Sequence, residues 1–415
     1  MLWCALAAPA HSNPLCGVCA NPQQFAGGMM RASSRGLISA VGEKKVLYIR
    51  LNFSDDLTQP ITETTATERM QEVSHFFRTH SYGKCWMKST VTPLLTFPSL
   101  KSAYFSTNSA GLVTWDPQRM LTDALDVARA AGFSPGDYDL HLLRFNAPFY
   151  QSWGYIGTSG AWLVTSDVPT TAHEIGHNLG LNHANSWSGP LNGPGANKEY
   201  DDLYDIMGYP YRFDLAGFHT INKTALGWLD ESHTMRVTNS GVYRLYAHDT
   251  NQPVAHRTYA LRIKKDDERD YWIEKRQRFD FSDEMKSSGV LAYWDSWSES
   301  NYGTQLLDPS PAEGWGLPIH DLLSDRVAGL RVIPLRQAED RSYIEVAVFL
   351  GNAPLTILPG LIHFAGLPNQ NYNLQSSTDL RSWTNVKQFS APDGEFVLPV
   401  SANTKGLFYR VQPAQ

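Results

Sequence analysis

The sequence has few cysteines, few charged residues and no long apolar run. Its 415 residues include only 4 Cys, too few for a small scaffold held together by disulfides. Charged residues make up 18% of the chain and aromatic residues 12%, a balance that excludes an intrinsically disordered protein. No apolar run reaches the roughly 18 residues that a membrane-spanning helix needs. The 35 Lys and Arg stand against 41 Asp and Glu, and the missing basic excess argues against a nucleic-acid or anionic-membrane partner.

Three of the four cysteines, Cys4, Cys16 and Cys19, fall in residues 1–39. We predict that this segment is an N-terminal arm with a signal or pro-segment remnant. Its apolar stretch is short and no Lys or Arg precedes it, so an irregular arm or a start inside a longer precursor remains open. A disulfide from the arm to Cys85 would fit an oxidising compartment, but the pairing of the four cysteines cannot be assigned from sequence.

Residues 40–230 alternate between strand and helix patterns. Buried strands are predicted at 45–53, 139–145 and 160–165, and helices at 67–80 and from Pro117 to Gly132. This alternation is typical of an α+β or α/β domain, here with a mixed twisted sheet and an active-site helix.

The pattern changes after about residue 230. Short strands separated by turn residues are predicted at 241–247, 258–263, 270–275, 289–294 and 343–349, which is the spacing of a β-sandwich. A linker is predicted at 351–360. The expected organisation is thus an arm (1–39), a catalytic domain (40–230), a β-sandwich-like domain (231–350) and a small β module (351–415).

One segment carries recognisable chemistry. Residues 173–183 read His-Glu-Ile-Gly-His-Asn-Leu-Gly-Leu-Asn-His. On a helix, His173 and His177 share one face and supply two of the three protein ligands of a catalytic zinc. Glu174 can then reach a water on the metal and act as general base and acid.

Gly180 makes the third ligand available. A helix that continued past this position would carry His183 away from His177. A glycine at the helix end can take positive φ and reverse the chain, which brings His183 to the metal. The added Gly180 and His183 make the pattern far more specific than a lone H-E-x-x-H, for which a structural or degenerate site is the alternative.

The string resembles the metzincin signature H-E-x-x-H-x-x-G-x-x-H. Metzincins also carry a Met-turn, and Asp-Ile-Met-Gly-Tyr at 205–209 is similar to it. The resemblance implies that Met207 packs beneath the zinc. It also implies that Tyr209 binds the metal or steadies the oxyanion of the transition state, although a surface turn tyrosine would explain the same residue.

Within the metzincins, the chain resembles the gametolysin-like peptidases (family M11) and their bacterial relatives. Ser-Tyr-Gly-Lys at 81–84, the segment 223–229 and Tyr-Trp-Ile-Glu-Lys-Arg at 271–276 carry this resemblance. In such enzymes an edge strand before the active-site helix binds extended substrate, and 160–165 is the matching segment. Trp162 on it is interpreted as a core residue.

Two further features of the sequence could involve a metal ion, and each has an alternative interpretation. Pro-Leu-Cys-Gly-Val at 14–18 is similar to the cysteine-switch segment of latent metzincins, in which a thiolate, here Cys16, occupies the zinc. Leu15 replaces the usual Arg, and a disulfide or an untethered arm is the alternative. The acidic residues Glu199, Asp201, Asp202 and Asp205 could bind Ca²⁺, or form a solvated loop.

The residues after 360 resemble the small β modules that end many secreted planctomycete and verrucomicrobial proteins. Such a module could contact a cell surface or a glycan, or simply add stability. Together these observations predict a secreted, bacterial zinc endopeptidase that acts on extracellular polypeptides, with a specificity pocket set by the loops at 184–215. The alternatives are a non-catalytic binding protein with a metzincin fold and an amidase acting on a non-protein polymer.

Overall fold

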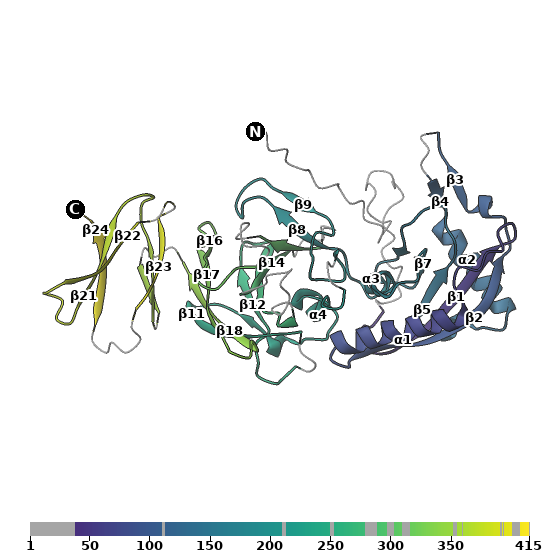
Figure 1. Cartoon of the computed structure of the whole chain (residues 1–415), viewed down its shortest axis with the longest axis horizontal. Coiled ribbons are helices and arrows are strands. Elements are labelled where there is room, and N and C mark those ends of the chain that lie inside the picture. Colours follow the sequence, from purple (N-terminus) through teal and green to yellow (C-terminus); the bar gives the residue numbers. More distant parts are fainter. Residues whose placement is uncertain are drawn as a thin grey trace, which may run out of the picture.

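The structure is a computed structural model that describes residues 38–109, 113–209, 213–249, 253–278, 289–296, 303–308, 316–351, 355–358, 360–390, 392, 394–400 and 407–414. The predicted arm, its signal remnant and the cysteine switch at Cys16 lie outside the described residues. Figure 1 shows three groups of elements along the long axis, with α1 and α2 at one end and the C-terminal strands at the other. Within the described residues, no helix has the length and apolar character needed to cross a membrane.

The first group contains a sheet with helices on both faces. Its helices are α1 (Glu63–His80), α2 (Pro117–Ala130) and α3 (Val168–Asn178), with short 3-10 turns η1 (Lys101–Ala103) and η2 (Pro135–Asp137). Helix α4 (Thr220–Ala225) and the turn η3 (Glu231–His233) come later in the chain, and α4 lies beside the strands of the second group in Figure 1. Its strands are β1 (Gly42–Phe53), β2 (Cys85–Phe97), β3 (Phe105–Thr107), β4 (Val113–Trp115), β5 (Leu140–Arg144), β6 (Trp153–Gly154) and β7 (Ala161–Leu163).

Strand β1 lies inside the five-stranded sheet β2-β1-β5-β7-β6, where it pairs in parallel with both β2 and β5. Successive side chains point to opposite faces. Val46 and Tyr48 join the core under α1 and α3, while Leu47 and Ile49 join the core under α2. Because both faces are covered, β1 reads as a continuous apolar run, as parallel strands do.

The predicted edge strand at 160–165 is not at the edge of the sheet. β7 pairs with β5 on one side and with β6 on the other, and β6, antiparallel to it, ends the described strand order. The sequence signal was too weak to show this, because β6 has only two residues. Trp162 is fully buried, which confirms its interpretation as a core residue.

Cys85 opens β2 and is a buried free thiol. Burial raises the pKa of this thiol to about 12, which makes it unreactive at neutral pH. Cys85 lies beneath α1, in the same apolar cluster as Phe77. The three arm cysteines lie outside the described residues, so the pairing of the four cysteines stays a prediction.

The second group is a two-sheet sandwich. Its strands are β8 (Ala184–Ser188), β9 (Ala196–Lys198), β10 (Thr234–Arg236), β11 (Gly241–Tyr246), β12 (Ala260–Lys264), β13 (Arg269–Glu274), β14 (Leu291–Ser296), β15 (Thr304–Leu307), β16 (Leu323–Asp325), β17 (Leu330–Gln337) and β18 (Tyr343–Leu350). A seven-stranded sheet, β10-β12-β13-β14-β15-β8-β9, faces the four-stranded sheet β11-β18-β17-β16 across a shared apolar core.

The C-terminal group has two three-stranded antiparallel sheets, β19-β20-β23 and β22-β21-β24. Their bounds are β19 (Leu355–Leu358), β20 (Leu361–Ala365), β21 (Tyr372–Ser377), β22 (Thr384–Phe389), β23 (Glu395–Pro399) and β24 (Phe408–Pro413). A small core that includes Ile362, Leu374 and Leu398 joins them.

The predicted fold class is confirmed: a mixed α+β domain is followed by mostly antiparallel β modules. The domain boundaries stay a prediction. Strands β8 and β9 follow His183 within the predicted catalytic domain, but they belong to the same sheet as β12–β15, so this sheet crosses the predicted boundary at residue 230.

Candidate metal centre

Helix α3, which carries the His-Glu-x-x-His motif, is buried along almost its whole length. Asp167 caps α3, with its Oδ1 accepting the Thr170 N–H at 2.8 Å, as N-cap carboxylates do. Ala172 and Ile175 face the core under α1. The opposite face therefore presents the two histidines of the motif away from that core.

Gly180 ends the helix as the sequence predicts. Its φ is +104°. The Gly180 N–H donates to the His177 carbonyl at 2.8 Å, and the Leu181 N–H donates to the Gly176 carbonyl at 3.1 Å. With Leu179 as C-cap, this is the hydrogen-bond pair of a Schellman motif. The chain reverses here and returns His183 to the helix.

His173, His177 and His183 come together as predicted. Each offers a ring nitrogen, these nitrogens lie within 4.8 Å of one another, and all three residues are buried. Within the described residues, this is the group of side chains that could hold a metal ion.

The outer nitrogens of the two helix histidines are fixed by main-chain carbonyls. His173 Nδ1 lies 2.8 Å from the carbonyl oxygen of Ile206, and His177 Nδ1 lies 2.8 Å from that of Leu181. A carbonyl only accepts, so in each ring Nδ1 carries the proton and Nε2 is the lone-pair nitrogen. Such hydrogen bonds set the tautomer and orientation of metal-binding histidines.

The inner nitrogens fit a zinc ion. His177 Nε2 and His183 Nε2 are 3.1 Å apart, close to the roughly 3.4 Å between two ligand nitrogens on a tetrahedral zinc with Zn–N bonds of about 2.0–2.1 Å. His173 Nε2 is buried and has no hydrogen-bond partner, which is costly unless an ion takes its lone pair. Three imidazoles are the ligand set of many catalytic zinc sites.

The segment that resembles the Met-turn packs against helix α3, and the role of Met207 beneath a zinc ion stays a prediction. Met207 is fully buried, and its sulfur lies against Gly176, so closely that a Cβ at that glycine would collide with it. The Met207 N–H donates to Asp205 Oδ1 at 2.7 Å. Because the Ile206 carbonyl accepts from His173, the turn also orients a ligand.

Glu174 is fully buried on the same helix. Gly154, on edge strand β6, packs directly against it: a Cβ built at Gly154 would lie 2.8 Å from the Glu174 carbonyl oxygen and 3.0 Å from its Oε2. The Glu174 carboxylate thus lies against Gly154 of β6, the last strand of the five-stranded sheet as described.

Two residues contact the triad in a way that the sequence did not predict: Glu199, which was considered only as a calcium ligand, and Tyr200. Glu199 Oε1 lies 2.9 Å from His183 Nδ1, and the Tyr200 ring centroid lies 4.2 Å from that of His183 and 6.1 Å from that of His173. Tyr200 has a φ of +64°, uncommon for a non-glycine residue, and Asn185 Oδ1 accepts its N–H at 3.0 Å. In the sequence, only the acidic residues of this loop drew attention to it, and the role predicted for them was calcium binding.

Tyr209, in contrast, is 41% exposed, and its N–H donates to the Asp202 carbonyl at 3.1 Å. Within the described residues, the tyrosine ring that contacts the triad is that of Tyr200. The metal-binding or oxyanion role of Tyr209 stays a prediction.

The four acidic residues of this loop have separate partners. Glu199 contacts His183, Asp201 accepts from Ser186 Oγ at 2.7 Å, and Asp205 holds the Met-turn. Burial raises the pKa of Asp202 to about 8, so at neutral pH this carboxyl is largely protonated. The predicted calcium site gains no support from this arrangement.

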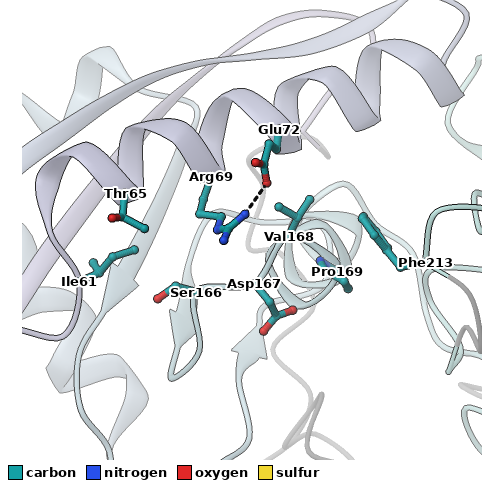
Figure 2. Close-up of a pocket in the computed structure, with 9 residues that line it drawn as sticks. All are labelled: Ile61, Thr65, Arg69, Glu72, Ser166, Asp167, Val168, Pro169 and Phe213. Atoms are coloured by element: carbon teal, nitrogen blue, oxygen red, sulfur yellow. Dashed lines mark hydrogen bonds and ion pairs between the residues drawn. The ribbon is translucent and has the colours of Figure 1, made fainter.

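Two depressions lie along α1 and away from the triad. One, of about 580 Å³, is lined by Ile61, Thr65, Arg69, Glu72, Ser166, Asp167, Val168, Pro169 and Phe213. Figure 2 shows that it lies between α1 and the first turn of α3, with Arg69 paired to Glu72. None of its lining residues is a predicted site residue.

Comparison with known proteins gives a direct family match. The model of the reprolysin-like metallo-peptidase family M12B matches residues 151–219, a span that runs from β6 through the triad and the Met-turn. Residues 151–219 are thus similar to the reprolysin-like metallopeptidases. This match does not test the finer prediction that the chain belongs to the gametolysin-like peptidases.

Two other comparisons add less. No curated protein matches the chain. Among solved structures, wild-type OgpA from Akkermansia muciniphila is similar at 8% sequence identity and a TM-score of 0.27, with 93% of this chain and 95% of OgpA covered. The metallopeptidase assignment rests on the match at 151–219 and on the geometry of the triad.

Proposed function

We propose that this chain is a secreted zinc-dependent endopeptidase of bacterial origin that hydrolyses peptide bonds in extracellular proteins. The observation that carries the proposal is the triad itself. Three buried imidazoles, each held at Nδ1, turn their other nitrogens toward one point, within a span that matches a metallopeptidase family. Bound zinc would polarise the scissile carbonyl and acidify the attacking water.

Glu174 is the proton carrier in this proposal. Its carboxylate lies one residue beyond His173 and faces β6, so it can take the proton of the attacking water and pass it to the leaving amine. The buried site keeps bulk water away from this transfer, which strengthens the electrostatic interactions involved.

Edge strand β6 would bind the substrate main chain. It ends the described strand order, and Gly154 lies against Glu174. An extended peptide added beside β6 would run past this carboxylate, in the manner of β-augmentation. This contact would place a scissile bond near the triad, and the side-chain preference would come from the neighbouring loops.

The gametolysin-like subfamily is part of the proposal, and contacts between the resembling segments support it. Lys223 Nζ donates to the Tyr82 hydroxyl at 2.9 Å, and Lys84 Nζ donates to the Trp228 carbonyl at 2.7 Å. Segments 81–84 and 223–229 thus meet in space. We also propose the division into a catalytic domain (40–230), a sandwich (231–350) and a C-terminal module (351–415).

The decisive experiment is Glu174→Gln in the full chain, with cleavage of casein or gelatin and zinc content measured on the same samples. We expect zinc to be retained and the cleavage rate to fall by about 10²–10⁴-fold, the usual contribution of general acid–base catalysis. A zinc chelator should abolish cleavage by the wild type.

Glu68→Gln on the exposed face of α1 is the matched control and should cleave like the wild type. A zinc-loaded wild-type protein that is inert on many polypeptides would contradict the peptidase proposal. That result would favour a binding protein or, if a non-protein polymer were cleaved, an amidase.

A further inference from the structure

Strand β15 of the second group meets the metal centre at its N-terminal end. It pairs in parallel with β8, with Thr304 opposite Ala184, the residue after the third histidine. Gly303, just before β15, has a φ of +66°, and the place of its missing Cβ is filled by the His183 carbonyl oxygen. The backbone of the second group therefore lies directly against that of His183.

The same end of β15 also reaches the Met-turn. Thr304 Oγ1 lies 2.7 Å from His219 Nε2. The backbone N–H of His219 donates to Asp205 Oδ2 at 2.6 Å, and Asp205 Oδ1 accepts the backbone N–H of Met207 at 2.7 Å. Three hydrogen bonds thus connect Thr304 to the turn beneath the triad.

The direction of the first bond follows from the imidazole of His219. Its Nδ1 accepts the N–H of Asn222 at 3.1 Å, so in the neutral ring the proton is on Nε2 and is donated to the Thr304 hydroxyl. Burial lowers the pKa of His219, which keeps the ring neutral. All four residues in this chain of bonds, including Asp205, are buried.

A second connection runs from the C-terminal end of β13 and the residues just after it to residues on either side of the Met-turn. Arg276 donates to the Tyr204 carbonyl at 2.6 Å, and Glu274 Oε2 accepts from both the N–H and the hydroxyl of Thr220. Tyr204 also packs against Trp272 in the apolar cluster on this face of the seven-stranded sheet. The Met-turn segment is therefore supported by the second group along its length.

We propose that Gly303 and Thr304 are positioning residues of the metal centre. One strand end fixes the main chain at His183 and, through His219 and Asp205, the turn whose Ile206 carbonyl orients His173. The spacing between the first and third ligands is then set by a strand some 120 residues further along the chain. This inference rests on the proposed zinc function.

The test is Thr304→Val in the full-length, metal-free chain, with zinc affinity measured by competition with a chromophoric chelator. Valine keeps the shape but leaves His219 Nε2–H without its acceptor. We expect zinc affinity to fall about tenfold, the lower end of what outer partners of metal ligands contribute. Thr304→Ser, which retains the hydroxyl, should restore it.

Thr234→Val, on β10 of the same sheet and equally buried, is the control for a general loss of packing. Unfolding temperatures of the metal-free variants should match, while zinc affinity differs only for Thr304→Val. The visible absorption of the cobalt-substituted protein, which reports ligand geometry, should change in that variant alone.

Unchanged zinc affinity and cobalt absorption in Thr304→Val would overturn the positioning role and leave the peptidase proposal intact. Equal losses in both valine variants would also overturn it, because packing alone would then explain the effect. A wild-type chain that binds no zinc would overturn both proposals.

Discussion

Each imidazole of the triad is held at Nδ1 by an acceptor of its own: two main-chain carbonyls and one carboxylate. The carboxylate, Glu199, differs from the carbonyls because it is charged and because it can be replaced by mutation. It also raises the basicity of His183, as carboxylate partners of metal-binding histidines do. At the scale of single residues, substitution of Glu199 is therefore the most direct way to test how an outer hydrogen bond affects zinc affinity.

We expect Glu199→Ala to weaken zinc binding by about 10–100-fold and Glu199→Gln, which keeps an acceptor oxygen, to weaken it less. Chelator competition on the full chain measures both. Glu268→Gln, an exposed substitution in the loop before β13, provides the baseline. If Glu199→Ala bound zinc as tightly as the wild type, the hydrogen bond would have no part in ligand orientation.

The contact of Tyr200 with His183 could not be predicted from the sequence. The three ligands and Glu174 could be predicted because their spacing on a helix and the Gly180 reversal are local features. Tyr200 reaches His183 only because β9 pairs with β8 and turns back over the site. Its φ of +64° leaves no mark in the sequence, since tyrosine rarely takes this conformation.

At the scale of elements, the end of α3 has a close counterpart in α2. Gly132 follows α2 with a φ of +91° and makes the same pair of bonds, with its N–H donating to Arg129 and that of Phe133 donating to Ala128. Helices α1 and α4 end with the same pair of bonds, at Tyr82 and Gly227, so the motif recurs among the helices of the structure. Only the end of α3, at Gly180, leads into a metal ligand.

Gly132 and Gly180 allow the effect of backbone strain on stability to be distinguished from the effect of the chain reversal on zinc binding. We expect Gly180→Ala and Gly132→Ala each to lower the free energy of unfolding by about 1–2 kcal/mol, because alanine is strained at positive φ. Only Gly180→Ala should also weaken zinc binding. Denaturant unfolding and chelator competition measure the two effects, and equal zinc affinity in the two variants would show that the reversal at Gly180 is not what places His183.

Elements with a regular pattern could be predicted, and those formed by distant pairing could not. Helix α2 begins at Pro117 as expected, and most predicted strands lie within two residues of their observed bounds. Strand β2 was missed because its 13 residues are mostly half-exposed and do not alternate. The pairing of β8 with β15 was missed because nothing local joins residues so far apart in the chain.

At the scale of the whole molecule, the C-terminal group is fixed to the sandwich by a buried charge cluster. Glu395 on β23 accepts from His363 on β20 and from Arg331 on β17, next to an apolar cluster that also spans both groups. Burial would raise the pKa of Glu395, but the bonds from His363 and Arg331 outweigh it and lower this pKa to about 2.

The lowered pKa predicts acid sensitivity of this junction. The carboxylate contributes its full stabilisation above its ordinary pKa of 4.5, and this contribution is lost as the pH falls from there toward about 2. Glu395→Gln should lower stability by about 3–5 kcal/mol at pH 7, because Arg331 stays buried without its partner. Calorimetry of the full chain at several pH values should show this difference shrinking below about pH 4.5. A difference independent of pH would contradict the role of the charge.

The pairing of β8 with β15 also has a consequence for the order in which the metal centre can be completed during synthesis. His183 leaves the ribosome well before Gly303 and Thr304, which lie about 120 residues later in the chain. At a typical synthesis rate of about 5–20 residues per second, that interval is on the order of 6–24 s. Throughout it, the nascent chain carries the whole H-E-x-x-H motif but lacks the strand end that we propose positions the third ligand, so we expect a complete metal centre only after the second group has been made.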